Sequence, residues 1–154
     1  MFRTTVLAMT LALSAAAHGA SAEDYAKNSA AAVRVRYMVN NVPAATEFYV
    51  GKLGFKVDFA SGAYFAALSR GGLQLLLSPT TGPGGASRAM PNGERPAPGG
   101  WTRIVLNTPD LKGEVERLRK AGVHFRNDIV VGLGGSEILF DDPSGNPVEL
   151  FQPG

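Results

Sequence analysis

The 154-residue chain contains no cysteine, so disulfides and cysteine nucleophiles are excluded. Histidine is almost as scarce, since only His18 and His124 are present. The charges nearly balance, with 13 acidic and 15 basic side chains and no basic run. This balance argues against nucleic acid or an anionic membrane surface as a partner. Because the chain has no cysteine and can form no disulfide, the fold must be held together by its apolar core alone.

The N-terminus has the pattern of a secretory signal peptide. Residues 1–3 form a short cationic start, residues 6–17 form an apolar run, and residues 20–22 (Ala-Ser-Ala) fit a cleavage site. We therefore predict that residues 1–22 are a signal peptide, that the mature protein is periplasmic or secreted, and that it has no membrane partner after cleavage. An uncleaved membrane anchor is the alternative. Cleavage would leave His124 as the only histidine.

From residue 33 onward, one order of elements occurs twice. Alternating apolar residues predict a strand at 33–39 and another at 101–106, and each is followed by a helix with Asn41 or Asp110 as its N-cap. Further strands are expected at 55–60, 63–69 and 72–78 in the first half, and at 123–131, 137–141 and 147–151 in the second. Each half has about 65 residues, which is too few to bury a sufficient core alone, so both should pack as one domain.

Two Gly- or Ala-rich segments lie outside this repeat. Residues 79–100 are rich in Gly and Pro and have no periodicity, so we predict no packed element there. They are either a flexible linker between the halves or a lid that brings Arg88, Met90 and Arg95 close to a ligand. Residues 23–32 are predicted to be a flexible leader.

Counting from the N-caps relates the two halves residue by residue. Arg34 and Arg103 each lie seven residues before their cap. Gln74 in a Leu-Gln-Leu triplet is then matched to Glu149 in a Val-Glu-Leu triplet near the end of the chain. Strand alternation also places these side chains on the face opposite the helices. The residues expected on that face are Arg34, Arg36, Gln74, Trp101, Arg103, Glu149 and Phe151.

Three stretches resemble the vicinal oxygen chelate superfamily, which includes glyoxalases, extradiol dioxygenases and bleomycin-resistance proteins. They are NVPAATEFY at 41–49, LGF at 53–55 and DPSGNPVEL at 142–150. The resemblance implies an α+β fold of paired βαβββ modules, whose curved mixed sheets surround a cavity, and it implies a homodimer. The expected single domain spans 33–152, with module one at 33–78, the linker or lid at 79–100, and module two at 101–152.

The resemblance also implies a divalent metal in the cavity, held by two His, a Glu and a fourth His, Glu or Gln. In this sequence the equivalent positions hold Arg34, Gln74, Arg103 and Glu149. A guanidinium has no lone pair to donate to a metal, and His124 starts a different strand. We therefore predict that no metal and no other cofactor is bound.

Two interpretations of the cavity residues follow, and both can hold. Arg103 can pair with Glu149 on the adjacent strand in place of a metal. The arginines can also bind an anionic or carbonyl-bearing small molecule stacked on Trp101. Metal-independent small-molecule binding, as in the bleomycin-resistance type, is the preferred function.

Two alternatives to binding stay open. One is a glyoxalase-like lyase or isomerase, in which Glu149 is the general base and Arg34 and Arg103 stabilise an enolate oxygen. The other is a structural or interaction protein whose cavity is filled by its own side chains.

Overall fold

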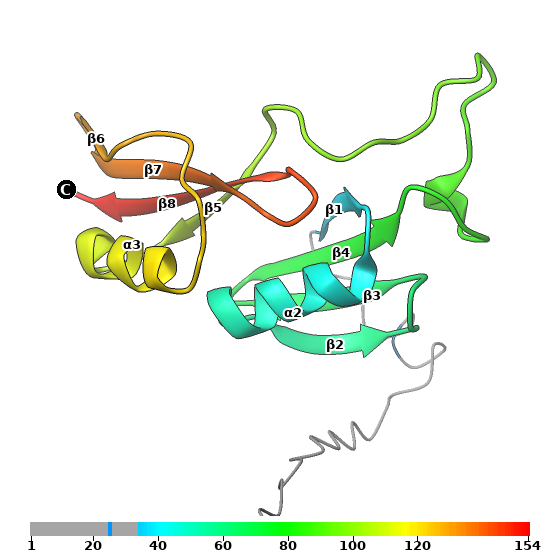
Figure 1. The fold of residues 1–154 in the computed structure, drawn as a ribbon, viewed down its shortest axis with the longest axis horizontal. Helices are drawn as coiled ribbons and strands as arrows, with labels where there is room; N and C mark the ends of the chain where they lie inside the picture. The colour runs from blue at the N-terminus through cyan, green and yellow to red at the C-terminus, as the bar shows by residue number, and fades with distance from the viewer. Residues whose placement is uncertain (1–24, 26–33) are drawn as a thin grey trace, which may run out of the picture.

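The computed structural model describes residue 25 and residues 34–154 (Figure 1). The predicted signal peptide at 1–22 lies outside the described residues, and so does the predicted leader at 23–32 apart from Tyr25. Over the part of the chain that is described, no helix has the length and apolar character needed to cross a membrane.

Two βαβββ modules follow one another along the chain. Module one contains β1 (Arg34–Val39), α2 (Val42–Leu53), β2 (Lys56–Ala60), β3 (Ala66–Arg70) and β4 (Leu73–Pro79). Module two contains β5 (Ile104–Asn107), α3 (Leu111–Lys120), β6 (Val130–Gly132), β7 (Gly135–Asp141) and β8 (Pro147–Pro153). A 3₁₀ turn, η1 (Gly85–Ser87), lies between the modules.

Each module forms its own four-stranded sheet. Sheet one has the order β1-β4-β3-β2, and sheet two has the equivalent order β5-β8-β7-β6. The β1–β4 and β5–β8 pairs are parallel, and the remaining pairs are antiparallel, so both sheets are mixed. Figure 1 shows α2 lying across sheet one and α3 beside sheet two, and neither sheet closes on itself. The predicted fold of paired βαβββ modules is confirmed.

The two helices start where the sequence predicts. The Asn41 side chain accepts a hydrogen bond from the Ala44 N–H at 2.9 Å, and the Asp110 side chain accepts one from the Gly113 N–H at 3.0 Å. At the other end of α2, Gly54 adopts a left-handed conformation with φ of 69°, which glycine tolerates without a Cβ clash.

One apolar core serves both modules, because each sheet buries the face that meets its helix. The core cluster includes Val39 and Tyr49 of module one together with Leu118 and Leu150 of module two. Tyr37 links the modules directly, since its hydroxyl donates to the Pro147 carbonyl at 2.8 Å and accepts from the Ile104 N–H at 2.9 Å. The two modules therefore share one core and are joined by the Tyr37 hydroxyl.

The turn before β8 is organised around a buried carboxylate. Asp142 is 4% exposed, and its Oδ1 accepts from the backbone N–H groups of Ser144 and Asn146. Its Oδ2 accepts from the Asn146 side-chain amide and from the Tyr49 hydroxyl. The Asn146 amide also donates to the Met38 carbonyl, so this turn fastens module two to the end of β1.

Alkaline pH should weaken this arrangement. Burial raises the pKa of Tyr49, and the adjacent Asp142 carboxylate raises it further, while burial also raises the pKa of Tyr37. Above about pH 10 the unfolded chain releases the Tyr49 phenolic proton that the folded protein retains, so the free energy of unfolding should fall by up to about 1.4 kcal/mol per pH unit for this residue, and Tyr37 should add to the fall. Urea unfolding between about pH 9 and about pH 11 measures this slope. The variant Tyr49→Phe should lose stability less steeply, and equal slopes would contradict the assignment.

Two predictions about local structure are wrong. The strand expected at 123–131 reduces to β6, because Asn127 Oδ1 accepts the Leu139 N–H at 2.9 Å in place of strand pairing, and Phe125 forms only an isolated bridge to Phe140. The segment 79–100, expected to lack any packed element, contains η1. Ser87 in that turn is 4% exposed, and its hydroxyl donates to the Pro79 carbonyl at 2.6 Å.

Candidate functional site

The face of each sheet opposite its helix, called here the open face, carries the residues singled out in the sequence. On β1, the exposed residues Arg34 and Arg36 alternate with the half-buried Val35 and the buried Tyr37, which pack against the core. Arg34 lies beside Gln74 of β4, and Arg36 lies beside Leu76, because the strands are parallel and in this register. The predicted residues Arg34, Arg36 and Gln74 therefore share the open face of sheet one.

Arg36 lines a hollow at the edge of this face. Its guanidinium donates to the Ser78 hydroxyl and lies 5.9 Å from the centre of the Phe65 ring. The hollow has a volume of about 550 Å³ and contains polar groups, an aromatic wall and a permanent positive charge. Its lining consists of Arg36, Tyr64, Phe65, Ser78 and residues 83–87.

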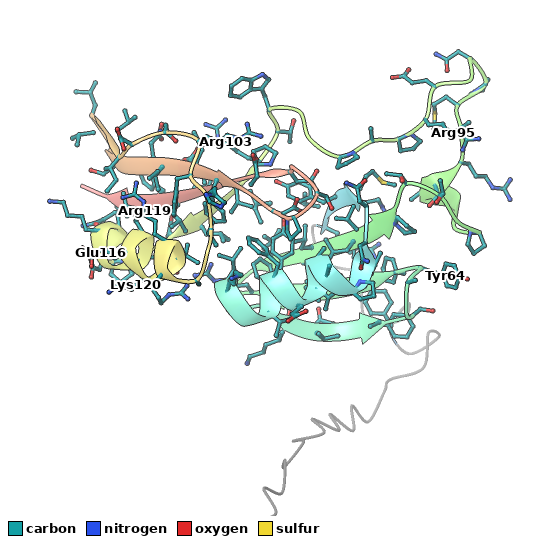
Figure 2. All side chains as sticks on the ribbon, viewed as in Figure 1. Tyr64, Arg95, Arg103, Glu116, Arg119 and Lys120 are labelled. Atoms are coloured by element: carbon teal, nitrogen blue, oxygen red, sulfur yellow. The ribbon has the colours of Figure 1, made fainter. Side chains whose placement is uncertain are left out.

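The segment 79–100 therefore contributes to the site at its beginning. Residues 83–87 form part of the lining of the hollow that also contains Arg36. Further along, Arg88 and Met90 are exposed, and Figure 2 shows Arg95 on the outer part of the segment, away from both sheets. The lid and the linker interpretations of that outer part both stay predictions.

Gln74 belongs to a polar cluster on the same open face. Its side-chain N–H donates to Asp58 Oδ2 at 2.9 Å, and the Ser69 hydroxyl donates to Asp58 Oδ1 at 2.7 Å. Its carbonyl oxygen accepts the Tyr25 hydroxyl at 3.3 Å. The Tyr25 ring stacks on Phe59, with ring centres 5.3 Å apart and an angle of 16° between the planes.

On the open face of sheet two, Arg103 and Glu149 form the ion pair expected from the sequence (Figure 2 labels Arg103). Arg103 Nε donates to Glu149 Oε2 at 2.6 Å. Glu149 is only 5% exposed, whereas the Arg103 side chain is 32% exposed. Since the pair bridges a strand of module two and the residue before β5, it fixes the entry of the chain into that module.

The aromatic residues predicted for sheet two have different surroundings. Trp101 is 77% exposed, and the guanidinium of Arg126 lies 5.9 Å from its ring centre. Arg126 also pairs with Asp141 at 2.6 Å. Phe151 is half-buried in β8, beside Asn107 and Glu137. Arg126, the cation that lies over Trp101, is not among the residues predicted from the sequence.

The match between Gln74 and Glu149 is wrong by two residues. Glu149 pairs with Val105, which lies five residues before Asp110, and the residue five before Asn41 is Arg36. Arg36 pairs with Leu76 rather than Gln74. Leu76 is therefore the counterpart of Glu149, and Arg103 reaches Glu149 diagonally along the sheet.

Comparison with known proteins is consistent with this architecture. The family model described as the Glyoxalase/Bleomycin resistance protein/Dioxygenase superfamily matches residues 31–150. The chain belongs to this superfamily. No curated protein matches the chain.

Several solved structures align with most of this chain, although their sequence identity to it is low. TnmS3, an antibiotic-binding protein from Streptomyces sp. CB03234, is 24% identical, with 80% of this chain and 95% of that chain covered and a TM-score of 0.61. Lactoylglutathione lyase from Agrobacterium tumefaciens is 20% identical, with 80% and 93% covered and a TM-score of 0.63. A superfamily member from Sphaerobacter thermophilus DSM 20745 is 24% identical, with 79% and 95% covered and a TM-score of 0.62. These likenesses show the fold.

The residues at the superfamily's metal positions do not fit a divalent ion. Arg34 and Arg103 carry guanidinium groups without a lone pair to donate, and Glu149 Oε2 already accepts from Arg103. His124 is exposed after α3. Among residue 25 and residues 34–154, no group of three or more His, Cys, Asp or Glu side chains could hold a metal ion.

Sequence reasoning missed several residues of the open face of sheet one. Ser78 lies four residues beyond Gln74 on the same strand, so simple alternation could have placed it there. Phe65 lies just before β3, two residues before Ala67 and four before Ser69, so alternation along the strand could also have placed it on this face. Tyr25 carried no such signal, because its flanking sequence has no periodicity.

Proposed function

We propose that this exported protein binds a small anionic or carbonyl-bearing molecule without a catalytic metal, and that Arg36 is the main polar anchor. The observation that supports this function most strongly is the hollow in which Arg36 and Phe65 lie together. A guanidinium can donate two parallel hydrogen bonds to a carboxylate or one to a carbonyl oxygen, and an aromatic wall accommodates the apolar part of the ligand.

Arg36 is a better anchor than Arg103 because its charge is less compensated. Arg103 donates its Nε–H to a buried carboxylate at 2.6 Å. Within residues 34–154, the ion pairs do not involve Arg36, whose guanidinium has a neutral hydroxyl partner in Ser78. The Arg36 charge is therefore available to an anionic or carbonyl group that enters the hollow.

The superfamily context is compatible with binding. One structural neighbour, TnmS3, is an antibiotic-binding protein, although at 24% identity it supports the fold alone. Metal independence is part of the proposal because the donor set is poor. Export follows from the pattern of residues 1–22, and a homodimer follows from the resemblance. Light scattering of the purified protein would measure the oligomeric state.

Removal of the Arg36 guanidinium should weaken ligand binding. A thermal-shift screen of small carboxylates and carbonyl compounds would identify a ligand, and calorimetry would give its dissociation constant. Arg36→Ala should weaken binding by about 10- to 100-fold, because a charge-assisted hydrogen bond contributes about 1.5–3 kcal/mol. Arg119→Ala is the matched control, since it removes the same side chain from α3 (Figure 2) and should leave affinity unchanged.

Two results would contradict the proposal. Equal affinities of Arg36→Ala and the unaltered protein would show that the hollow is not the anionic or carbonyl site. Stoichiometric zinc, nickel, iron or manganese in the purified protein would contradict metal independence.

A further inference from the structure

The ring of Tyr25 occupies a defined place on the open face of sheet one. It stacks on Phe59 at 5.3 Å and meets Phe65 at 6.0 Å, tilted by 58°. Phe59 and Phe65 are themselves in contact, with ring centres 6.1 Å apart. The three rings form a cluster separate from the main core, so this part of the sheet offers two aromatic walls to a planar group.

Beside the Tyr25 ring, Gln74 presents a hydrogen-bond acceptor to the Tyr25 hydroxyl. Asp58 is an acceptor when ionised, so its bond with Gln74 requires Gln74 to use its N–H. The Gln74 carbonyl oxygen is thereby left as the acceptor, and the Tyr25 hydroxyl donates to it at 3.3 Å. The Ser69 hydroxyl donates to the second carboxylate oxygen of Asp58. Both Asp58 oxygens are therefore acceptors, and Gln74 remains the donor toward Asp58. A hydroxyl-bearing ring fits, whereas an ether or ketone in that position would meet a second acceptor.

This place adjoins the hollow of the proposed function. Phe65 contacts the Tyr25 ring and also lines the hollow, where the Arg36 guanidinium lies 5.9 Å from its centre. A single ligand could therefore place a phenol against Phe59 and Gln74 while its anionic or carbonyl group meets Arg36.

We propose that Phe59, Phe65 and Gln74 form a subsite for a phenolic ring, which the chain's own Tyr25 fills until a phenolic ligand displaces it. This inference rests on the proposed binding function and deepens it, since it specifies a hydroxyaryl class of ligand. The predicted cleavage after residue 22 keeps Tyr25 in the mature chain, so the competitor is retained after export.

The probe for this subsite is 4-methylphenol, which has the ring and hydroxyl of a tyrosine side chain and no anionic or carbonyl group. In the full chain, Tyr25→Ala should lower the dissociation constant of 4-methylphenol about tenfold, because the Tyr25 ring no longer competes for the subsite. Titration should also shift the NMR signal of the Gln74 side-chain amide. Leu133→Ala is the control: it removes an exposed apolar side chain from the turn between β6 and β7 of module two and should leave the affinity for 4-methylphenol unchanged.

A second comparison tests the hydrogen bond. With Tyr25 replaced by Ala, 4-methylphenol should bind about fivefold or more tightly than 4-methylanisole, which lacks the donor. Adding Gln74→Leu should abolish this preference. The subsite is wrong if Tyr25→Ala leaves the affinity for 4-methylphenol unchanged, or if the two probes bind equally in that variant.

The outcome is separable from that of the proposed function. Because 4-methylphenol is neutral, Arg36→Ala should not alter its binding, so a failure of the Arg36 experiment would not by itself remove the phenol preference. Conversely, equal binding of the two probes would reject the subsite while the Arg36 effect on carboxylates could still stand.

Discussion

Replacement of Asp142 by Ala should lower the free energy of unfolding by about 3–4 kcal/mol. The carboxylate is 4% exposed and accepts hydrogen bonds from two backbone N–H groups, the Asn146 amide and the Tyr49 hydroxyl. Its loss leaves these donors buried without an acceptor, and each such group costs about 1–3 kcal/mol when water cannot replace the partner. Partial relaxation of the turn reduces the sum. Urea unfolding at neutral pH gives the value.

The neighbouring residue supplies the control. Asp141 is also a carboxylate, but it pairs with Arg126 near the surface, and its side chain is 40% exposed. Asp141→Ala should therefore cost less than about 1 kcal/mol. If both substitutions cost the same, the network around Asp142 does not hold the modules together. A large loss for Asp142 alone would establish the turn as a structural clamp between β1 and β8.

The sequence predicted the parts of the fold that follow from local chemistry. Asn41 and Asp110 are good N-caps wherever they occur before a helical pattern, and both perform that role here. The alternation around Tyr37 and Val39 correctly identified the face that meets α2, because one side of each sheet must be buried. The ion pair between Arg103 and Glu149 was predictable because a carboxylate on an apolar strand requires a partner.

Other parts could not be predicted from the same reasoning. A shift of two residues along a strand keeps every side chain on its own face, so alternation could not reveal that Leu76, rather than Gln74, is equivalent to Glu149. The position of Tyr25 depends on rings far away in the sequence, Phe59 and Phe65, and has no periodic signal. Asn127 replaces a stretch of strand pairing with a side-chain bond, which apolar patterns cannot show.

These differences move the centre of the candidate site. The resemblance to metal-binding relatives implies a metal at Glu149, but Glu149 pairs with Arg103. The hollow, the aromatic cluster and the less compensated arginine instead lie on sheet one. Binding and structural support are therefore expected to be divided between the sheets, and substitutions on sheet two should affect stability first.

Arg103→Met tests that division. It should lower the free energy of unfolding by about 2–3 kcal/mol, because it leaves the Glu149 carboxylate buried without its cation. The value lies below the range for a fully buried pair, since the Arg103 side chain is 32% exposed and water can partly replace it. The double variant Arg103→Met/Glu149→Met should recover most of the loss, because two apolar side chains of similar size leave no buried charge. Urea unfolding of the two single variants and the double variant completes the cycle.

The same double variant decides between a binding protein and a lyase that uses Glu149 as its base. If Glu149 serves only the ion pair, the double variant should fold and retain its affinity for the ligand found with Arg36. Glu149→Gln should likewise retain that affinity. A lyase with Glu149 as proton acceptor would lose turnover by about 10²-fold or more in Glu149→Gln while still binding substrate. Measurable turnover that vanishes in this variant would overturn the binding function, because the carboxylate would then accept a proton despite its bond to Arg103. Unchanged affinity without turnover in either protein would leave the pair as a structural replacement for the superfamily's metal.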